Sequence, residues 1–153
     1  MKIHFTSSNS KEALILKKNY LDQYGQVKLN EAETIVAIGG DGEMLKALRL
    51  AIKHKSSVFG LNKGHIGFLM NKVKKTDLIR RIKKASQLTV HPLEMICYDN
   101  NNKKKIFLGI NEISLFRNTN QSSIISVNVN GVDRLKDLYC DGILVSTPVG
   151  STA

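Results

Sequence analysis

Cysteines, aromatic residues and long apolar runs are scarce in this sequence of 153 residues, and each shortage excludes a class of protein. Two cysteines, Cys97 and Cys140, are too few for a disulfide scaffold or for a zinc site of their own. No apolar run approaches the roughly 20 residues of a membrane span, and the N-terminus lacks a signal-peptide stretch. Because 42% of the residues are hydrophobic, wholesale disorder is excluded as well. We therefore expect a cytoplasmic globular protein with no membrane partner.

Acidic residues are also in the minority. The sequence has 23 Lys and Arg against 13 Asp and Glu, a net charge of +10, which favours anionic partners. Basic residues crowd 72–84, where Asp77 is the only acidic residue. Thr76 is a candidate N-cap there, and the apolar spacing predicts a helix with a solvated basic face. No aromatic residue is interleaved with the basic ones, so nucleic acid is the weaker interpretation.

The first part of the chain alternates strand-like and helix-like segments. A capping box at Asn9 and Glu12 predicts a helix start, and apolar residues from Met44 to Ile52 recur at helical spacing. Continuous apolar, β-branched runs are typical of strands buried on both faces of a parallel sheet. Strands are expected at 2–6, 34–38 and 58–61. This order predicts an α/β domain with a parallel sheet over residues 1–87.

The pattern changes near residues 86–92, and residues 88–153 are rich in β signals. Strands are predicted over 88–98, 106–110 and 143–145, and Asn130-Gly131 is a hairpin signal. We expect this second, β-rich domain to be antiparallel. Because a Ser/Thr/Gly-rich loop usually leads into another element, the end at 149–153 suggests that this domain is incomplete.

The turn Gly39-Gly40-Asp41-Gly42 follows a predicted buried strand and precedes a predicted helix. Open α/β sheets bind ligands at this edge, and Gly39, Gly40 and Gly42 would let a backbone approach phosphates closely. Asp41 would repel a phosphate, which leaves three interpretations open. It is an N-cap in a tight turn, a partner or general base for a hydroxyl group, or a ligand of a magnesium ion.

Three further segments also carry polar groups near predicted strand ends. Residues 62–69 form a second glycine turn; its His65 is typical of a surface loop, and its Phe68 is more typical of a core than of a stacking platform. The pair Asn111-Glu112 follows a predicted strand. Asp141-Gly142 precedes a loop at 146–153 that is dense in hydroxyl groups and backbone donors, which suits phosphate or ribose. The histidines and cysteines show no metal-ligand spacing, so we assign no metal-binding residue.

Taken together and in this order, the four segments resemble the NAD kinase family. Residues 141–153, from Asp141-Gly142 through Ser-Thr-Pro-Val-Gly-Ser-Thr-Ala, are the most specific match, since the glycine turn alone also resembles related lipid kinases and phosphofructokinases. The resemblance implies transfer of a phosphoryl group from ATP, or from polyphosphate, to the 2′-hydroxyl of the adenosine ribose of NAD, giving NADP. It also implies a divalent metal ion such as Mg²⁺ and a homo-oligomer, a dimer or tetramer.

The same resemblance implies roles for single residues. Asp41 would act on the 2′-hydroxyl, with Gly42 beside it and Phe68 in the pocket wall. The remaining residues would contact NAD or line its pocket, and these are Asn111, Glu112, Asp141, Thr152 and Ala153. The second domain would be β-sandwich-like.

Two departures from the family pattern and two alternatives matter. Glu43 stands where most relatives have Thr. Its carboxylate would repel donor phosphates unless the side chain points away or meets the metal. Tyr139 falls where many members carry a basic residue. The alternatives are a lipid kinase of the same superfamily and a basic nucleotide- or nucleic-acid-binding module without enzymatic activity.

Overall fold

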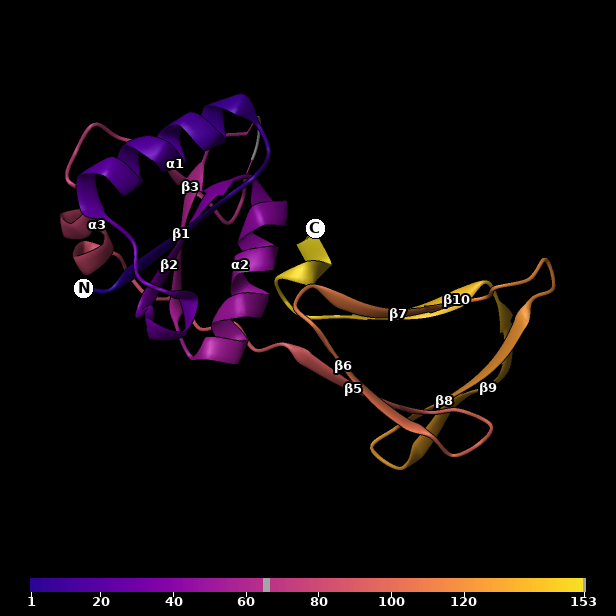
Figure 1. Cartoon of the computed structure of the whole chain (residues 1–153). Coiled ribbons are helices and arrows are strands. Elements are labelled where there is room, and N and C mark those ends of the chain that lie inside the picture. The colour runs from indigo at the N-terminus through magenta and orange to yellow at the C-terminus, as the bar shows by residue number, and fades with distance from the viewer. Residues whose placement is uncertain (65–66, 153) are drawn as a thin grey trace. The chain divides into compact units, whose positions relative to one another are not determined.

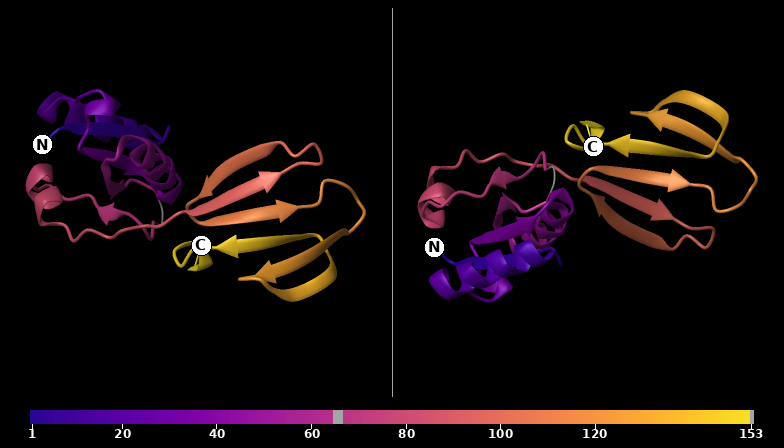
Figure 2. Two further views of the ribbon diagram at one scale, coloured as in Figure 1. Left: turned by 90° about the horizontal axis from the view of Figure 1, so that it is seen from below. Right: turned by 90° about the horizontal axis from the view of Figure 1, so that it is seen from above.

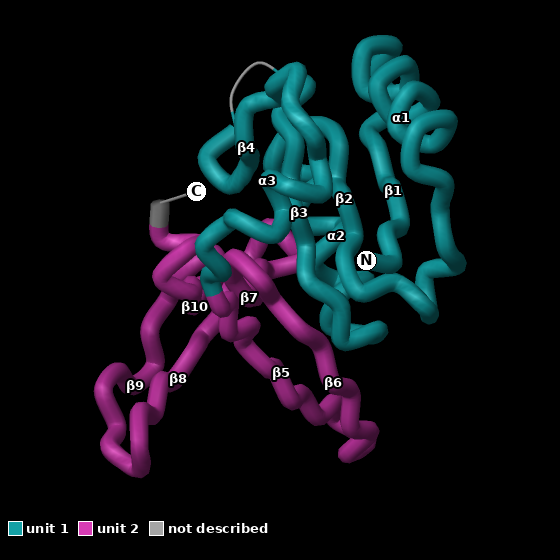
Figure 3. The backbone as a smooth tube through the Cα atoms, turned by 90° about the vertical axis from the view of Figure 1, so that its left-hand side faces the viewer, with its two compact units in different colours: residues 1–88 teal, residues 89–153 magenta. Residues whose placement is uncertain are grey.

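The computed structural model describes residues 1–64 and 67–152. The chain divides into two compact units, Met1–Leu88 and Thr89–Ala153, which are coloured separately in Figure 3. His65 and Ala153, both named from the sequence, lie outside the described residues. Within the described ranges, the helices are too short or too polar to cross a membrane.

Unit 1 is built on a four-stranded parallel sheet in the order β1-β2-β3-β4. The strands are β1 (Ile3–Ser7), β2 (Thr34–Gly39), β3 (Ser57–Asn62) and the short β4 (Asn71–Lys72). Every residue of β2 is buried, as its continuous apolar run predicts for a central parallel strand. The predicted α/β architecture with a parallel sheet is confirmed. The sequence did not predict β4, whose two residues are exposed and polar.

Helices cover both faces of this sheet (Figure 1). They are α1 (Lys11–Tyr24), α2 (Asp41–His54) and α3 (Leu78–Lys84), with a 3-10 turn η1 at Leu29–Glu31. Phe5 and Val36 pack with Tyr20 of α1 and Leu78 of α3 on one face. On the other face, Ile35 and Ala37 pack against two alanines of α2, Ala47 and Ala51. The alternation of side chains along β2 thus builds two apolar layers.

Two predicted helix caps are wrong by one residue. Ser10, not Asn9, caps α1: its hydroxyl oxygen accepts a hydrogen bond from the Ala13 amide at 3.3 Å. Asp77, not Thr76, caps α3, and its carboxylate accepts from the Arg80 amide at 2.7 Å. In both cases two neighbouring residues are able to cap, and the cap is the one that directly precedes the first helical residue.

Unit 2 consists of three antiparallel strand pairs, drawn as paired arrows in Figure 2. β5 (Leu93–Tyr98) pairs with β6 (Lys104–Gly109), β7 (Glu112–Phe116) with β10 (Gly142–Ser146), and β8 (Ser123–Val129) with β9 (Val132–Cys140). A 3-10 turn, η2 (Gly150–Thr152), follows.

The strand boundaries of unit 2 partly differ from the predictions. Asn130 and Gly131 have φ of 52° and 82°, as their predicted hairpin turn requires. The strand predicted from Leu88 begins only at Leu93, directly after Pro92, because proline has no N–H for the ladder. β7 was not predicted at all; it is recognisable only through its pairing with β10.

Candidate active site

The glycine turn stands at the carboxyl end of β2, where α2 begins. Gly39 is the last residue of β2, and a Cβ there would lie 3.1 Å from Ser8 Cβ, so the turn tolerates only a small residue. Gly40 caps α2 without any side-chain hydrogen bond. At Gly42, a Cβ would meet no atom within 4 Å. Open space and uncapped amides at the start of a 14-residue helix together form a surface that an anionic group can approach.

Asp41 ties this turn to the second glycine turn. Its Oδ2 accepts a hydrogen bond from the Phe68 amide at 2.9 Å, and its Oδ1 accepts from the Leu69 amide at 3.0 Å. A Cβ at Gly67 would come within 3.3 Å of Asp41 Oδ1. Asp41 is therefore not the N-cap of α2, since Gly40 occupies that position. Its carboxylate holds the segment 67–69 beside the end of β2, as expected if both turns face one edge of the sheet.

Phe68 projects from the segment that Asp41 holds. Phe68 is 88% exposed, so the expectation that favoured a core position is wrong. Its ring is open to contact, and its backbone amide is fixed by the hydrogen bond to Asp41. Phe68 is thus available as a wall for a bound molecule.

Glu43 points away from solvent in the first turn of α2. Its side chain is 6% exposed, and its Oε2 lies 3.7 Å from Lys46 Nζ. The carboxylate is therefore balanced by a cation one turn along the same helix and by the positive end of the helix dipole. This pairing reduces the repulsion that the Glu43 carboxylate would exert on donor phosphates bound nearby.

In unit 2, the buried hydroxyl of Thr147 organises the segment around Asn111. Thr147 Oγ1 lies 2.8 Å from the carbonyl oxygen of Ile110 and 3.1 Å from that of Asn111, and it accepts from the Gly150 amide at 3.0 Å. The Thr147 amide donates to Asn111 O at 2.8 Å. A side chain at Gly150 would collide with that same carbonyl oxygen. The conformation at Asn111 is thus determined by residues more than thirty positions later.

The side-chain oxygen Oδ1 of Asn111 is buried and has no hydrogen-bond partner among the described residues. Buried acceptors are nearly always paired, so an orphan of this kind marks a position where a bound donor is missing. Glu112, the next residue, is exposed at the start of β7. Together they offer an amide oxygen and a carboxylate to hydroxyl groups of a ligand.

Asp141 has a partner that sequence reasoning missed. Its Oδ1 accepts from Arg117 Nε at 2.5 Å, and the Arg117 amide donates to the Asp141 carbonyl oxygen at 2.8 Å. Arg117 also donates to the Thr119 carbonyl oxygen. Because the Asp141 side chain remains largely exposed, its second oxygen is free of this ion pair. The sequence carries no local signal for this pair, because its two residues are 24 positions apart.

The loop 146–153 uses part of its polar groups internally. Besides Thr147, the Ser151 hydroxyl donates to the Pro148 carbonyl oxygen at 2.9 Å. The buried Thr147 hydroxyl thus serves the backbone, whereas the exposed Ser151 donates within the loop and keeps an oxygen that can accept. That the loop binds phosphate or ribose stays a prediction. Thr152 lies in η2.

The described residues do not form a ready-made metal site. In the ranges 1–64 and 67–152, no three His, Cys, Asp or Glu side chains come together as a metal-binding group. Asp41 already accepts two amides, and Glu43 is paired with Lys46. A divalent ion would therefore depend on ligands from elsewhere, such as oxygens of bound phosphates.

Comparison with known proteins identifies the family of the chain. The family model of the ATP-NAD kinase N-terminal domain matches residues 2–90. The NAD kinase of Brucella melitensis biotype 1 is 42% identical over 151 residues, which are 99% of this chain and 59% of the relative. The NAD kinase of Caulobacter vibrioides is 39% identical over 152 residues, 99% of this chain and 58% of the relative.

A third relative, the NAD kinase of Rickettsia prowazekii, is 40% identical over 147 residues, 96% of this chain and 57% of the relative. The chain thus spans a little under three fifths of the length of these curated relatives. The family model covers more than half of the chain and includes both glycine turns that Asp41 joins. The chain belongs to the NAD kinase family.

Proposed function

We propose that the protein phosphorylates the 2′-hydroxyl of the adenosine ribose of NAD, with ATP or polyphosphate as donor, to give NADP. The observation that carries this proposal is the position of Asp41, a carboxylate at the carboxyl end of β2 beside an uncapped glycine turn. The names of the relatives, all NAD kinases, support the same reaction. Phosphoryl transfer depends mainly on positioning and charge stabilisation, which this arrangement can supply.

Asp41 would receive the ribose hydroxyl without releasing the second glycine turn. A carboxylate has about four lone-pair positions, and the Phe68 and Leu69 amides use one on each oxygen. A remaining position can accept the hydrogen bond of the hydroxyl group. Asp41 would then orient the hydroxyl oxygen toward the terminal phosphorus of the donor and take its proton as the new O–P bond forms. The bond from that phosphorus to the bridging oxygen breaks in the same transfer, and ADP or the shortened polyphosphate leaves with the oxygen.

The glycine turn would hold the donor phosphates. Gly39 and Gly40 keep side chains away from the turn, and at Gly42 the space around the Cβ position is open. The start of α2 adds the positive end of the helix dipole. Pairing of Glu43 with Lys46 reduces the repulsion between this carboxylate and an anionic donor.

The remaining residues would bind NAD. Phe68 would lie against the dinucleotide, because its ring is exposed on a backbone that Asp41 holds. Asn111 Oδ1 would accept from a ribose hydroxyl, which would satisfy its buried oxygen. Glu112 and Asp141 would offer carboxylate oxygens. Thr152 and Ala153 stay proposed as pocket-lining residues.

Properties of the whole enzyme belong to the same proposal. We place it in the cytoplasm as a dimer or tetramer, with Mg²⁺ bound together with ATP. The antiparallel unit 2 would belong to a β-sandwich-like domain. The high positive charge of the chain suits two polyanionic substrates.

The test is NADP formation from NAD, ATP and Mg²⁺, measured on this chain and on a version extended past Ala153. Asp41→Asn should lower kcat by about a hundredfold or more, because an amide cannot accept the hydroxyl proton. Asp22→Asn, an exposed carboxylate on α1, makes the same charge change and should have no effect. If NADP forms equally well with Asp41→Asn, the catalytic role is refuted; if no version forms NADP with ATP or polyphosphate, the proposed reaction is.

A further inference from the structure

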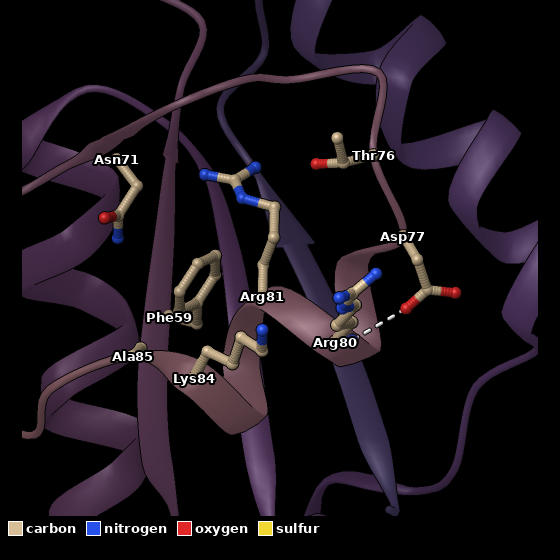
Figure 4. A pocket seen from close by; sticks show the side chains of 8 residues that line it. All are labelled: Phe59, Asn71, Thr76, Asp77, Arg80, Arg81, Lys84 and Ala85. Carbon is tan, nitrogen blue, oxygen red and sulfur yellow. Dashed lines mark hydrogen bonds between the residues drawn. The ribbon is translucent and has the colours of Figure 1, made fainter.

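A cluster of basic residues lies on unit 1 away from the glycine turns, at α3 and the neighbouring parts of β3 and β4. A pocket of about 350 Å³ opens there, within the size range of small-ligand sites. Figure 4 shows the side chains that line it, from β3, β4 and α3 and the residues beside α3. Three of them are cationic, namely Arg80, Arg81 and Lys84, and Asp77 is the only carboxylate.

Arg81 is held in one orientation at the centre of this pocket. Its Nη2 donates to the Lys72 carbonyl oxygen at 2.7 Å, and its guanidinium carbon lies 5.5 Å from the centre of the Phe59 ring. The other terminal nitrogen, Nη1, is buried and has no hydrogen-bond partner among the described residues. A pre-oriented guanidinium with an unsatisfied donor lacks an acceptor, and the planar fork matches phosphate oxygens.

The charges around Arg81 are not balanced by the protein. Over residues 1–64 and 67–152, none of the three cations has a carboxylate within ion-pair distance. Asp77 instead uses its Oδ1 to cap α3. Arg80 and Lys84 are exposed one turn apart on α3, so their side chains can close over the same ligand.

We infer that this pocket binds a terminal phosphate group of a small phosphorylated molecule, at a site separate from the glycine turns. Arg81 makes the fixed contact, and Arg80 and Lys84 supply the mobile cations. The pocket is concave, and Phe59 is covered by Arg81 and is 7% exposed, so it offers no platform for stacking a base. This favours a small phosphate compound over a nucleic-acid strand, which binds through exposed aromatic rings and an extended basic groove.

The test is a titration of the ¹⁵N-labelled chain with pyrophosphate, followed by amide and arginine Nε resonances. We expect shifts at Asn71 and at residues 80–84. Arg81→Met, which keeps an aliphatic stem over Phe59, should weaken binding by about tenfold or more. Lys83→Met removes the same charge from the same helix, but Lys83 does not line the pocket, so affinity should change by about twofold at most.

Lys84→Met provides a second variant in case Arg81→Met disturbs the fold, because Lys84 is exposed and its side chain makes no hydrogen bond or ion pair with the described residues. It should also weaken binding more than Lys83→Met. The inference is overturned if Lys83→Met and the pocket variants lose affinity equally, or if pyrophosphate shifts only residues 39–42. It is equally overturned if a thymidine oligonucleotide binds along 72–84 and pyrophosphate does not. None of these readouts depends on NADP formation.

Discussion

Replacing Thr147 by valine removes one buried hydroxyl and keeps the shape of the side chain. Thr147 is 3% exposed, and its Oγ1 serves the Ile110 and Asn111 carbonyl oxygens and the Gly150 amide. In the valine variant the Gly150 N–H has no acceptor and Ile110 O loses its side-chain donor. Asn111 O keeps the Thr147 amide.

The expected cost follows from these groups. Leaving a buried donor or acceptor unsatisfied costs about 1–3 kcal/mol. Thr147→Ser keeps the hydroxyl and loses one methyl group, which is worth about 0.8 kcal/mol. Valine should therefore destabilise the segment around Asn111 and Gly150 more than serine does.

Hydrogen exchange of the segments 109–112 and 147–151 measures this difference locally. Exchange by opening accelerates about tenfold for every 1.4 kcal/mol lost, so a cost of about 1–3 kcal/mol should raise the rate in the valine variant by about fivefold to 150-fold over the wild type. Exchange in α1 of unit 1 serves as the internal reference and should not change. Equal rates in the valine and serine variants would show that the hydroxyl does not bridge these backbone groups.

Two further predictions concern unit 1. Gly42→Ala should leave stability unchanged or raise it by up to about 1 kcal/mol, because alanine is favoured in a helix and its Cβ meets no atom within 4 Å. The same methyl group would occupy space proposed for the donor phosphates, so the KM for ATP should rise. An unchanged KM would contradict phosphate binding at this turn. Burial raises the pKa of the Tyr20 phenol above its ordinary value of about 10. The unfolded chain therefore releases this proton first, and stability should fall as the pH rises past about 10. Tyr20→Phe should reduce that fall in urea unfolding, whereas Tyr139→Phe, an exposed phenol, should not; equal slopes would refute the assignment.

Local chemistry in the sequence was sufficient for much of unit 1 and for one turn of unit 2. The run 34–38 is apolar and β-branched, so it predicts a buried parallel strand, and β2 is buried throughout. Gly39 and Gly40 mark the end of that strand because glycines separate its apolar run from the helical apolar spacing that begins at Met44. Asn130-Gly131 predicts a tight hairpin because both residues tolerate positive φ. In each case the signal lies within a few neighbouring residues.

The contacts at the candidate site were decided only by the tertiary structure. Asp41 accepts hydrogen bonds from the amides of residues 27 and 28 positions later in the chain. Asp141 pairs with Arg117, which lies 24 positions earlier. Thr147 turns its hydroxyl inward because the carbonyl oxygens of Ile110 and Asn111 lie against it. A polar residue in a loop has the same sequence signature whether it faces a ligand or a distant backbone group. The pairing of strands and turns places those groups, and only that placement distinguishes the two roles.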